Sequence, residues 1–155
     1  MKGNDQILIV LNGLLADELT AINQYIVHAE MCENWGYERL DKAIQSRAIQ
    51  EMKHAEKLIA RILFLEGKPV VSNLTAIHIG ANLEAQHAND WTAEYNAIQS
   101  YNMGIAVAVE VNDNGTRALL ESIVSDEEAH IDWIEAQTAQ IAQVGLQNYL
   151  GEQIE

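Results

Sequence analysis

Two short motifs that pair a carboxylate with an imidazole are the part of this sequence best suited to chemistry. They are Glu51-x-x-His54 and Glu127-x-x-His130. Residues three apart on an α-helix lie on one face, about one turn from each other, so each motif aims both of its side chains in one direction. Each motif therefore offers half of a metal site, and the two together suggest a site for a pair of metal ions.

A two-metal site needs further carboxylates, and Glu18 and Glu94 are suitable because each lies in the middle of its own helix-like stretch. Four carboxylates and two neutral imidazoles would balance two divalent ions and leave a neutral buried centre. Such an oxygen-rich set suits Fe(II) or Mn(II) better than structural zinc. Glu51 and Glu127 are the best candidates for bridging ligands, because each has its own histidine as a terminal ligand. The plainer alternative is that these acids lie on solvated helix faces and that the two motifs arose by chance.

Apolar residues that recur every three or four positions predict an all-α chain. Glycines and the single proline separate the periodic stretches, as expected where helices end. The predicted elements are four long helices over about 5–35, 38–65, 81–111 and 116–144, and a short fifth helix over about 146–153. The short turn between the first two helices makes them antiparallel.

The segment of about 67–82, between the second and third predicted helices, lacks helical periodicity and decides the topology. Roughly 15 extended residues at about 3.3 Å each reach up to about 50 Å, the length of a helix of about 30 residues. We therefore expect a four-helix bundle with a long crossover. The candidate ligands then lie within about 5 Å of their helix midpoints and share one level of the bundle. Glu18, Glu51 and Glu127 each interrupt an apolar face, so we expect them to point inward.

The composition favours one acidic domain over residues 1–155. A chain of this length can bury roughly 70% of its unfolded surface without the help of disulfides. The only cysteine, Cys32, is expected to be a packed side chain rather than a reactive thiol, and its isolation favours a reducing, cytoplasmic location. The net charge of −14 argues against nucleic acid or an anionic membrane as a partner. No stretch is long and apolar enough to span a bilayer.

Segments along the whole chain resemble bacterioferritins. The resembling segments are Met1–Gly3, Ala21–Tyr25, Glu51–Ala55, Arg61–Gly67, His130–Trp133 and Gly145–Leu150. The resemblance implies a ferritin-like fold with a di-iron centre formed by Glu18, Glu51, His54, Glu94, Glu127 and His130. It further implies oxidation of Fe(II) by dioxygen or peroxide, storage of ferric mineral in a hollow shell of about 24 subunits, and haem b at two-fold interfaces.

The resemblance also gives roles to residues that spacing leaves undecided. Met52 follows Glu51 by one residue and is turned about 100° away from it, so periodicity makes it an incidental surface residue. In bacterioferritins the methionine at this motif position ligates haem iron, one from each of two symmetry-related subunits, and Met52 becomes the expected axial ligand. By spacing, Tyr25 and Trp133 are candidate core aromatics, whereas aromatics near the centre of bacterioferritins are thought to pass electrons.

The remaining histidines and methionines belong to no motif. His28, His78 and His87 lack partnered spacing, and we expect them to be surface or locally bonded residues. Met31 and Met103 are expected to be packing residues.

Ser46 and Gln50 depart from a feature of some bacterioferritins, which carry a histidine and an aspartate there, on the inner face of the second helix, for an extra iron. An auxiliary inner-surface site is therefore not expected. The hypothesis that follows is that iron passes inward through the di-iron centre itself, with His130 moving as a gate.

The leading interpretation is an iron-storage ferroxidase, with a ferredoxin-type protein as the candidate reductant for iron release. A non-storage di-iron peroxidase or oxidase of the rubrerythrin type is the alternative, although the chain has no Cys-x-x-Cys pair for a rubredoxin-like centre. A DNA-protecting mini-ferritin or a purely structural bundle is a third interpretation. Mini-ferritins place iron ligands between subunits, whereas this chain holds a complete set, and its negative charge opposes DNA binding.

Overall fold

The computed structural model describes residues 1–155, and its regular elements are all helices. They are α1 (Asp5–Asn34), α2 (Glu38–Phe64), α3 (Leu83–Glu110), α4 (Asn114–Val144) and the short α5 (Leu146–Gly151). The predicted all-α fold with four long helices and a short fifth is confirmed, and each boundary lies within about two residues of its predicted position. None of the helices contains an apolar stretch long enough to cross a membrane.

Side-chain caps explain where the helices begin. Asn4 accepts a hydrogen bond from the backbone of Gln6 at 2.8 Å, and Asn82 accepts one from Ala85 at 2.9 Å. Asp113 accepts one from the backbone N–H of Thr116 at 3.0 Å. This cap starts α4 at Asn114 rather than at Thr116, where the sequence placed its beginning.

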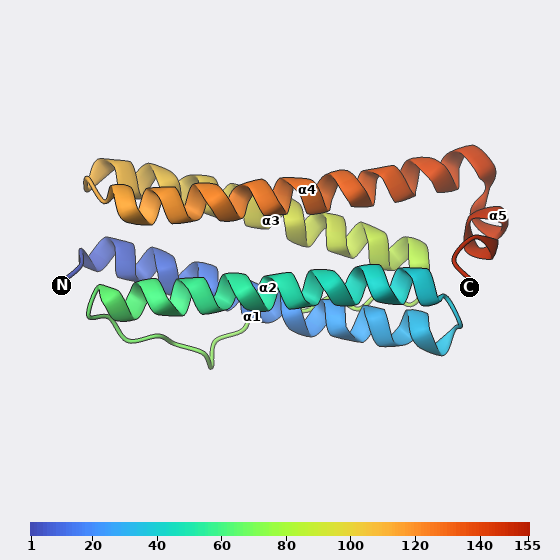
Figure 1. The fold of residues 1–155 in the computed structure, drawn as a ribbon, viewed down its shortest axis with the longest axis horizontal. Helices are drawn as coiled ribbons and strands as arrows, with labels where there is room; N and C mark the ends of the chain where they lie inside the picture. Colours follow the sequence, from blue (N-terminus) through green and yellow to red (C-terminus); the bar gives the residue numbers. More distant parts are fainter.

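The four long helices form two antiparallel pairs (Figure 1). α1 packs closely along α2, and α3 packs along α4, whereas α2 and α4 contact each other little. The crossover leaves the end of α2 and runs along the bundle to the start of α3 at the opposite end, as predicted, and α5 lies across that end (Figure 1). The inner faces of the four helices therefore meet along one central axis.

Three side chains of α1, spaced four residues apart, hold the crossover against the bundle. Each accepts a hydrogen bond from a backbone N–H of the crossover. The pairs are Thr75 with Thr20 at 2.8 Å, His78 with Gln24 at 3.1 Å and Gly80 with His28 at 3.0 Å. Because these donors are satisfied, the crossover can lie close to α1 without helical or strand structure of its own.

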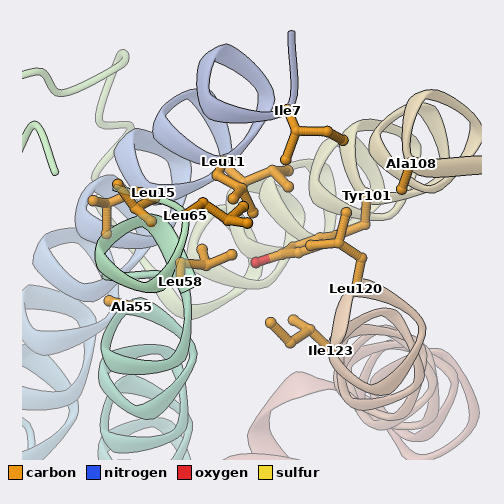
Figure 2. Packing of buried hydrophobic residues seen from close by; sticks show 12 residues of the cluster. Ile7, Leu11, Leu15, Ala55, Leu58, Leu65, Tyr101, Ala108, Leu120 and Ile123 are labelled. Carbon is orange, nitrogen blue, oxygen red and sulfur yellow. The ribbon is translucent and has the colours of Figure 1, made fainter. Parts of the chain in front are cut away.

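The apolar core is divided into two clusters. The larger contains 12 buried residues, among them Leu11, Leu58 and Leu120 (Figure 2), and the smaller contains eight. Along α1, Leu15 belongs to the first cluster and Tyr25 to the second, and buried Glu18 lies between them. A polar layer therefore crosses the middle of the bundle, at the level predicted for the metal ligands.

Some expectations about isolated residues are wrong. His28 and His87 are 0% and 2% exposed, so neither is a surface residue, and their hydrogen-bond partners lie 52 to 62 positions away in the sequence. Met103 is 70% exposed in the single chain rather than packed. The expectation for Cys32 is confirmed, because it is fully buried and burial raises the pKa of its thiol to about 12.

Candidate metal centre

The polar layer brings the six predicted ligands together, and each of them is at most 9% exposed. Their ligand atoms form two overlapping groups in which all atoms lie within 4.8 Å of one another. The first group is Glu18, Glu51, His54 and Glu127, and the second is Glu51, Glu94, Glu127 and His130. The structure therefore does not support the alternative in which these acids lie on solvated helix faces.

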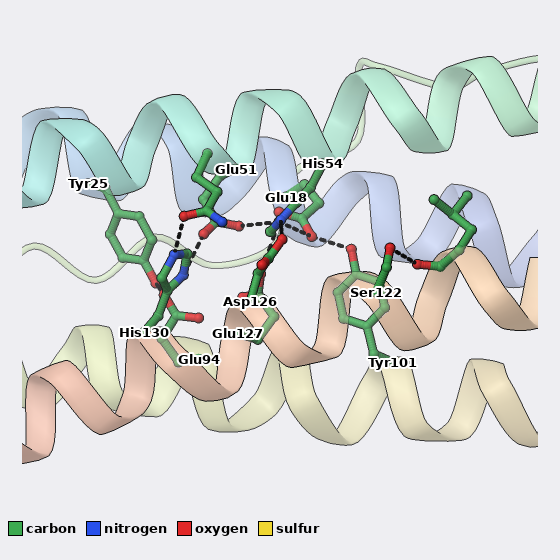
Figure 3. A network of polar contacts seen from close by, with 12 residues as sticks. Glu18, Tyr25, Glu51, His54, Glu94, Tyr101, Ser122, Asp126, Glu127 and His130 are labelled. Atoms are coloured by element: carbon green, nitrogen blue, oxygen red, sulfur yellow. Dashed lines mark hydrogen bonds and ion pairs between the residues drawn. The ribbon is translucent and has the colours of Figure 1, made fainter.

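Glu51 and Glu127 belong to both groups and lie between the two histidines (Figure 3). His54 Nδ1 lies 2.9 Å from Glu127 Oε1 and 3.3 Å from Glu51 Oε2. His130 Nδ1 lies 3.0 Å from Glu51 Oε1 and 3.4 Å from Glu94 Oε1. This arrangement is the one expected of two shared carboxylates with one terminal carboxylate and one imidazole on each side.

Two phenols hold the terminal carboxylates. Tyr25 donates a hydrogen bond to Glu94 at 2.5 Å, and Tyr101 donates one to Glu18 (Figure 3). Each bond joins α1 to α3, so it fixes the carboxylate and the helix pair together. Sequence reasoning missed Tyr101, although it follows Glu94 by seven residues, as Tyr25 follows Glu18.

The outer nitrogens of the two imidazoles are also held. His54 Nε2 donates to Asp126 Oδ2 at 2.9 Å, and His130 Nε2 donates to Gln50 Oε1 at 2.9 Å. A proton on Nε2 leaves the lone pair of Nδ1 facing the carboxylates, which is the form that ligates a metal. Sequence reasoning did not find these two partners, although each directly precedes the glutamate of a motif.

Burial of several carboxylates together shifts the pKa values in the centre and favours the binding of cations. Burial raises the pKa of Glu51 well above its ordinary value and the pKa of Glu127 to about 10. Burial would also raise the pKa of Glu94, but its close contacts with His130 and Glu127 lower it to about 2. Burial alone would lower the pKa of His54, yet its carboxylate contacts, first of all Glu127, raise that pKa above the ordinary value. The metal-free cluster therefore retains protons that a divalent cation would displace.

Several buried atoms of the cluster have no hydrogen-bond partner. They are Glu51 Oε1, Glu94 Oε2, Glu127 Oε1 and His130 Nδ1. Unpaired polar atoms are costly in a protein interior, and ligation of a metal removes that cost. Carboxylate oxygens with imidazole nitrogens are ligands that suit iron and manganese. The residues present therefore fit a pair of divalent metal ions.

A cavity of about 310 Å³ extends from the centre to the crossover. Carboxylates of the centre, including Glu18 and Glu94, line its inner part, and Asp17 lies beside them. Exposed residues of the crossover, Thr75 and His78, line its outer part. The cavity therefore connects the carboxylates with the surface between α1 and α3.

Tyr25 and Trp133 both lie close to a buried arginine. Tyr25 is 1% exposed, and Trp133 is partly buried. The Cζ atom of Arg47 lies 5.4 Å from the ring centroid of Tyr25 and 4.8 Å from that of Trp133. Arg47 is 5% exposed, and its Nε and Nη1 atoms have no hydrogen-bond partner. Sequence reasoning did not single out Arg47, because burial of this cation depends on rings that two other helices supply.

Met52 lies outside the cluster, as periodicity predicts. Its side chain is 46% exposed on α2, and so is Ile49, which lies three residues earlier on the same face. Ser46 is also exposed. The thioether of Met52 is therefore free to meet a group outside this chain.

Comparison with known proteins identifies a family and several related chains. Residues 10–144 match the family model described as a ferritin-like domain. The chain is 40% identical to the bacterioferritin of Mycobacterium leprae (strain TN) over 149 residues, which cover 96% of this chain and 94% of that protein. It is 38% identical to bacterioferritin BfrA of Mycobacterium tuberculosis (strain ATCC 25618 / H37Rv), with the same coverage. It is also 38% identical to the bacterioferritin of Rhodobacter capsulatus, with 96% and 92% covered. The chain belongs to the bacterioferritin family.

Proposed function

We propose that this chain is the subunit of an iron-storage ferroxidase that oxidises Fe(II) to Fe(III) with dioxygen or peroxide. The observation that carries the proposal is the convergence of six buried ligands into two overlapping groups. The relatives named as bacterioferritins support iron as the metal. The cavity of about 310 Å³ offers Fe(II) a route to the carboxylates from the outer surface.

The chain's own residues bind and orient two substrate ions. Glu18 with His54 and Glu94 with His130 serve as the terminal ligands, and Glu51 and Glu127 lie between the two positions. Two Fe(II) ions held side by side can together give dioxygen two electrons, so no one-electron radical need be released. Glu51 and Glu127 lose their protons as the cations bind, because burial holds those protons only in the metal-free state.

Storage requires assembly, because one bundle of helices cannot enclose a mineral. We propose a hollow shell of about 24 copies, built from dimers. The exposed thioether of Met52 fits an axial ligand of haem b at a two-fold interface, where the partner copy would supply the second thioether. Haem bound there would receive electrons from a ferredoxin-type protein and supply them to the stored iron.

Tyr25 and Trp133 are the candidates for passing electrons near the centre. The single buried cysteine favours the reducing cytoplasm as the location.

Removal of a ligand tests the proposal. Glu18→Ala and Glu127→Ala should each slow the rapid phase of Fe(II) oxidation about 100-fold or more, followed by the absorbance of the ferric product. Glu128→Ala is the matched control, because this exposed carboxylate directly follows Glu127 and should leave the rate unchanged. Size-exclusion chromatography should show the same assembly for all variants. A wild-type oxidation rate in Glu18→Ala would refute the centre.

A further inference from the structure

The candidate centre is close to two-fold symmetric within one chain. α1 and α3 each supply a glutamate and, seven residues later, a tyrosine that bonds to the glutamate of the other helix. α2 and α4 each supply a Glu-x-x-His motif, and the residue before each motif accepts a hydrogen bond from the histidine of the other. The matched pairs are Glu18 with Glu94, Tyr25 with Tyr101, Glu51 with Glu127, and His54 with His130.

Asp126 and Gln50 form a fifth matched pair, since each directly precedes a motif, and at this pair the symmetry is broken. The hydrogen bonds that these residues accept from His54 and His130 have the same length, 2.9 Å. Their chemistry differs, because Asp126 offers a charged carboxylate oxygen and Gln50 a neutral amide oxygen. The two imidazoles therefore have outer hydrogen bonds of equal length and unlike electrostatic support.

This difference reaches the metal through the imidazole ring. A histidine that donates its outer N–H to a carboxylate forms the stronger, charge-assisted hydrogen bond, and its inner nitrogen becomes a more basic ligand. A neutral amide holds the ring in orientation but adds no charge. The negative charge of Asp126 also attracts a cation at the His54 position directly, in addition to its effect through the ring. Both effects favour a cation at the His54 position.

We propose that Asp126 and Gln50 make the two metal positions unequal. A divalent ion binds first and more tightly at Glu18 and His54, and the position at Glu94 and His130 fills last and empties first. This inference rests on the proposed function, because it requires the two-metal centre. It assigns Asp126 and Gln50 as positioning residues, which act through the histidines and do not themselves ligate the pair.

Anaerobic titration of the assembled protein with Co(II), which reports binding without oxidation, tests this inference. The wild type should bind two equivalents per chain in two steps that differ at least about 10-fold in Kd. A crystal with one Co(II) per chain should show the anomalous peak at His54. Asp126→Asn should weaken only the tighter step, about 10- to 100-fold, so that the two steps merge. Gln50→Leu should weaken only the looser step.

Glu128→Gln is the matched control, because it removes an exposed carboxylate of the same helix that bonds to neither histidine. Both of its steps should equal those of the wild type, and thermal unfolding of each variant should verify folding. Two equal steps in the wild type, or equal weakening of both steps by Asp126→Asn, would overturn the inequality while the two-metal centre stands. Absence of any Co(II) binding would overturn the centre as well.

Discussion

Glu127 and His54 both hold protons more tightly in the folded chain than in the unfolded one. Burial raises the pKa of Glu127 to about 10, and contact with carboxylates raises the pKa of His54 although burial opposes it. Between pH 7 and 9 the unfolded chain has released these protons, so unfolding of the metal-free protein releases them too. The free energy of unfolding should therefore fall as the pH rises through this window. Calorimetric Tm values of the metal-free protein would show the decline.

Glu127→Gln provides the control for this pH dependence. The amide cannot titrate, so the decline in Tm between pH 7 and 9 should become shallower. His87 does not disturb the comparison, because burial lowers its pKa to about 4 and it stays neutral throughout the window. A Tm that rises from pH 7 to 9 in the metal-free wild type would contradict the raised pKa values of Glu127 and His54.

At the scale of residues, the convergence of the candidate ligands could be predicted and their supporting partners could not. Glu51 and His54 lie on one helix, so their common direction follows from helical geometry alone. Tyr101 and Asp126 act on ligands that belong to other helices, and those contacts depend on how the helices pack. The sequence does show that Tyr101 follows Glu94 by the same seven residues that separate Tyr25 from Glu18, and that Asp126 directly precedes a motif. These spacings become meaningful only once the pairing of the helices is known.

At the scale of elements, α1 supplies residues to the candidate centre and also binds the crossover. His28 holds α1 to both α3 and the crossover, because Nδ1 donates to buried Asp90 of α3 at 2.9 Å and Nε2 accepts the N–H of Gly80 at 3.0 Å. His28→Ala should lower the free energy of unfolding by about 2–3 kcal/mol, since it leaves the buried N–H of Gly80 without a partner and the buried Asp90 carboxylate with only the hydrogen bond from Gln24. Chemical denaturation followed by circular dichroism would measure the loss.

His78→Ala is the matched control for this prediction. His78 lies in the crossover two residues before Gly80, but its side chain is exposed and only its backbone is hydrogen-bonded to the bundle. The substitution should change the free energy of unfolding by no more than about 0.5 kcal/mol. Equal losses in the two variants would mean that the crossover is not held through His28.

The helices themselves could be predicted closely because their ends depend on local chemistry. Gly36 has a φ of 84°, which a glycine adopts without strain, and it follows α1 as the sequence indicates. Burial was harder to predict, because it depends on what faces a residue from another element. His28 faces Asp90 and Arg47 faces Trp133, and neither pair has a periodicity that links its members.

At the scale of the whole molecule, the single chain leaves many large apolar side chains exposed. Ile9, Leu63, Phe64 and Met103 are 73%, 58%, 52% and 70% exposed, and they are distributed over three of the long helices. Exposed apolar surface of this extent is typical of chains that bury it against further copies.

The mass of the purified protein separates the rival functions. About 24 chains favour the iron store, about 12 the mini-ferritin and about two the rubrerythrin-type peroxidase.

Met52 provides the remaining test at this scale, because the proposed haem ligation at a two-fold interface would depend on assembly and not on the metal centre. Met52→Leu keeps the size and apolarity of the side chain but removes the thioether, so the haem absorption band should be lost. The oxidation rate and the mass should stay at wild-type values. Met103→Leu is the matched control, since it changes another exposed methionine, 70% exposed, and should leave the spectrum intact. An unchanged spectrum in Met52→Leu would make Met52 an ordinary surface residue and leave the centre at Glu51 and Glu127 as the chain's only candidate metal site.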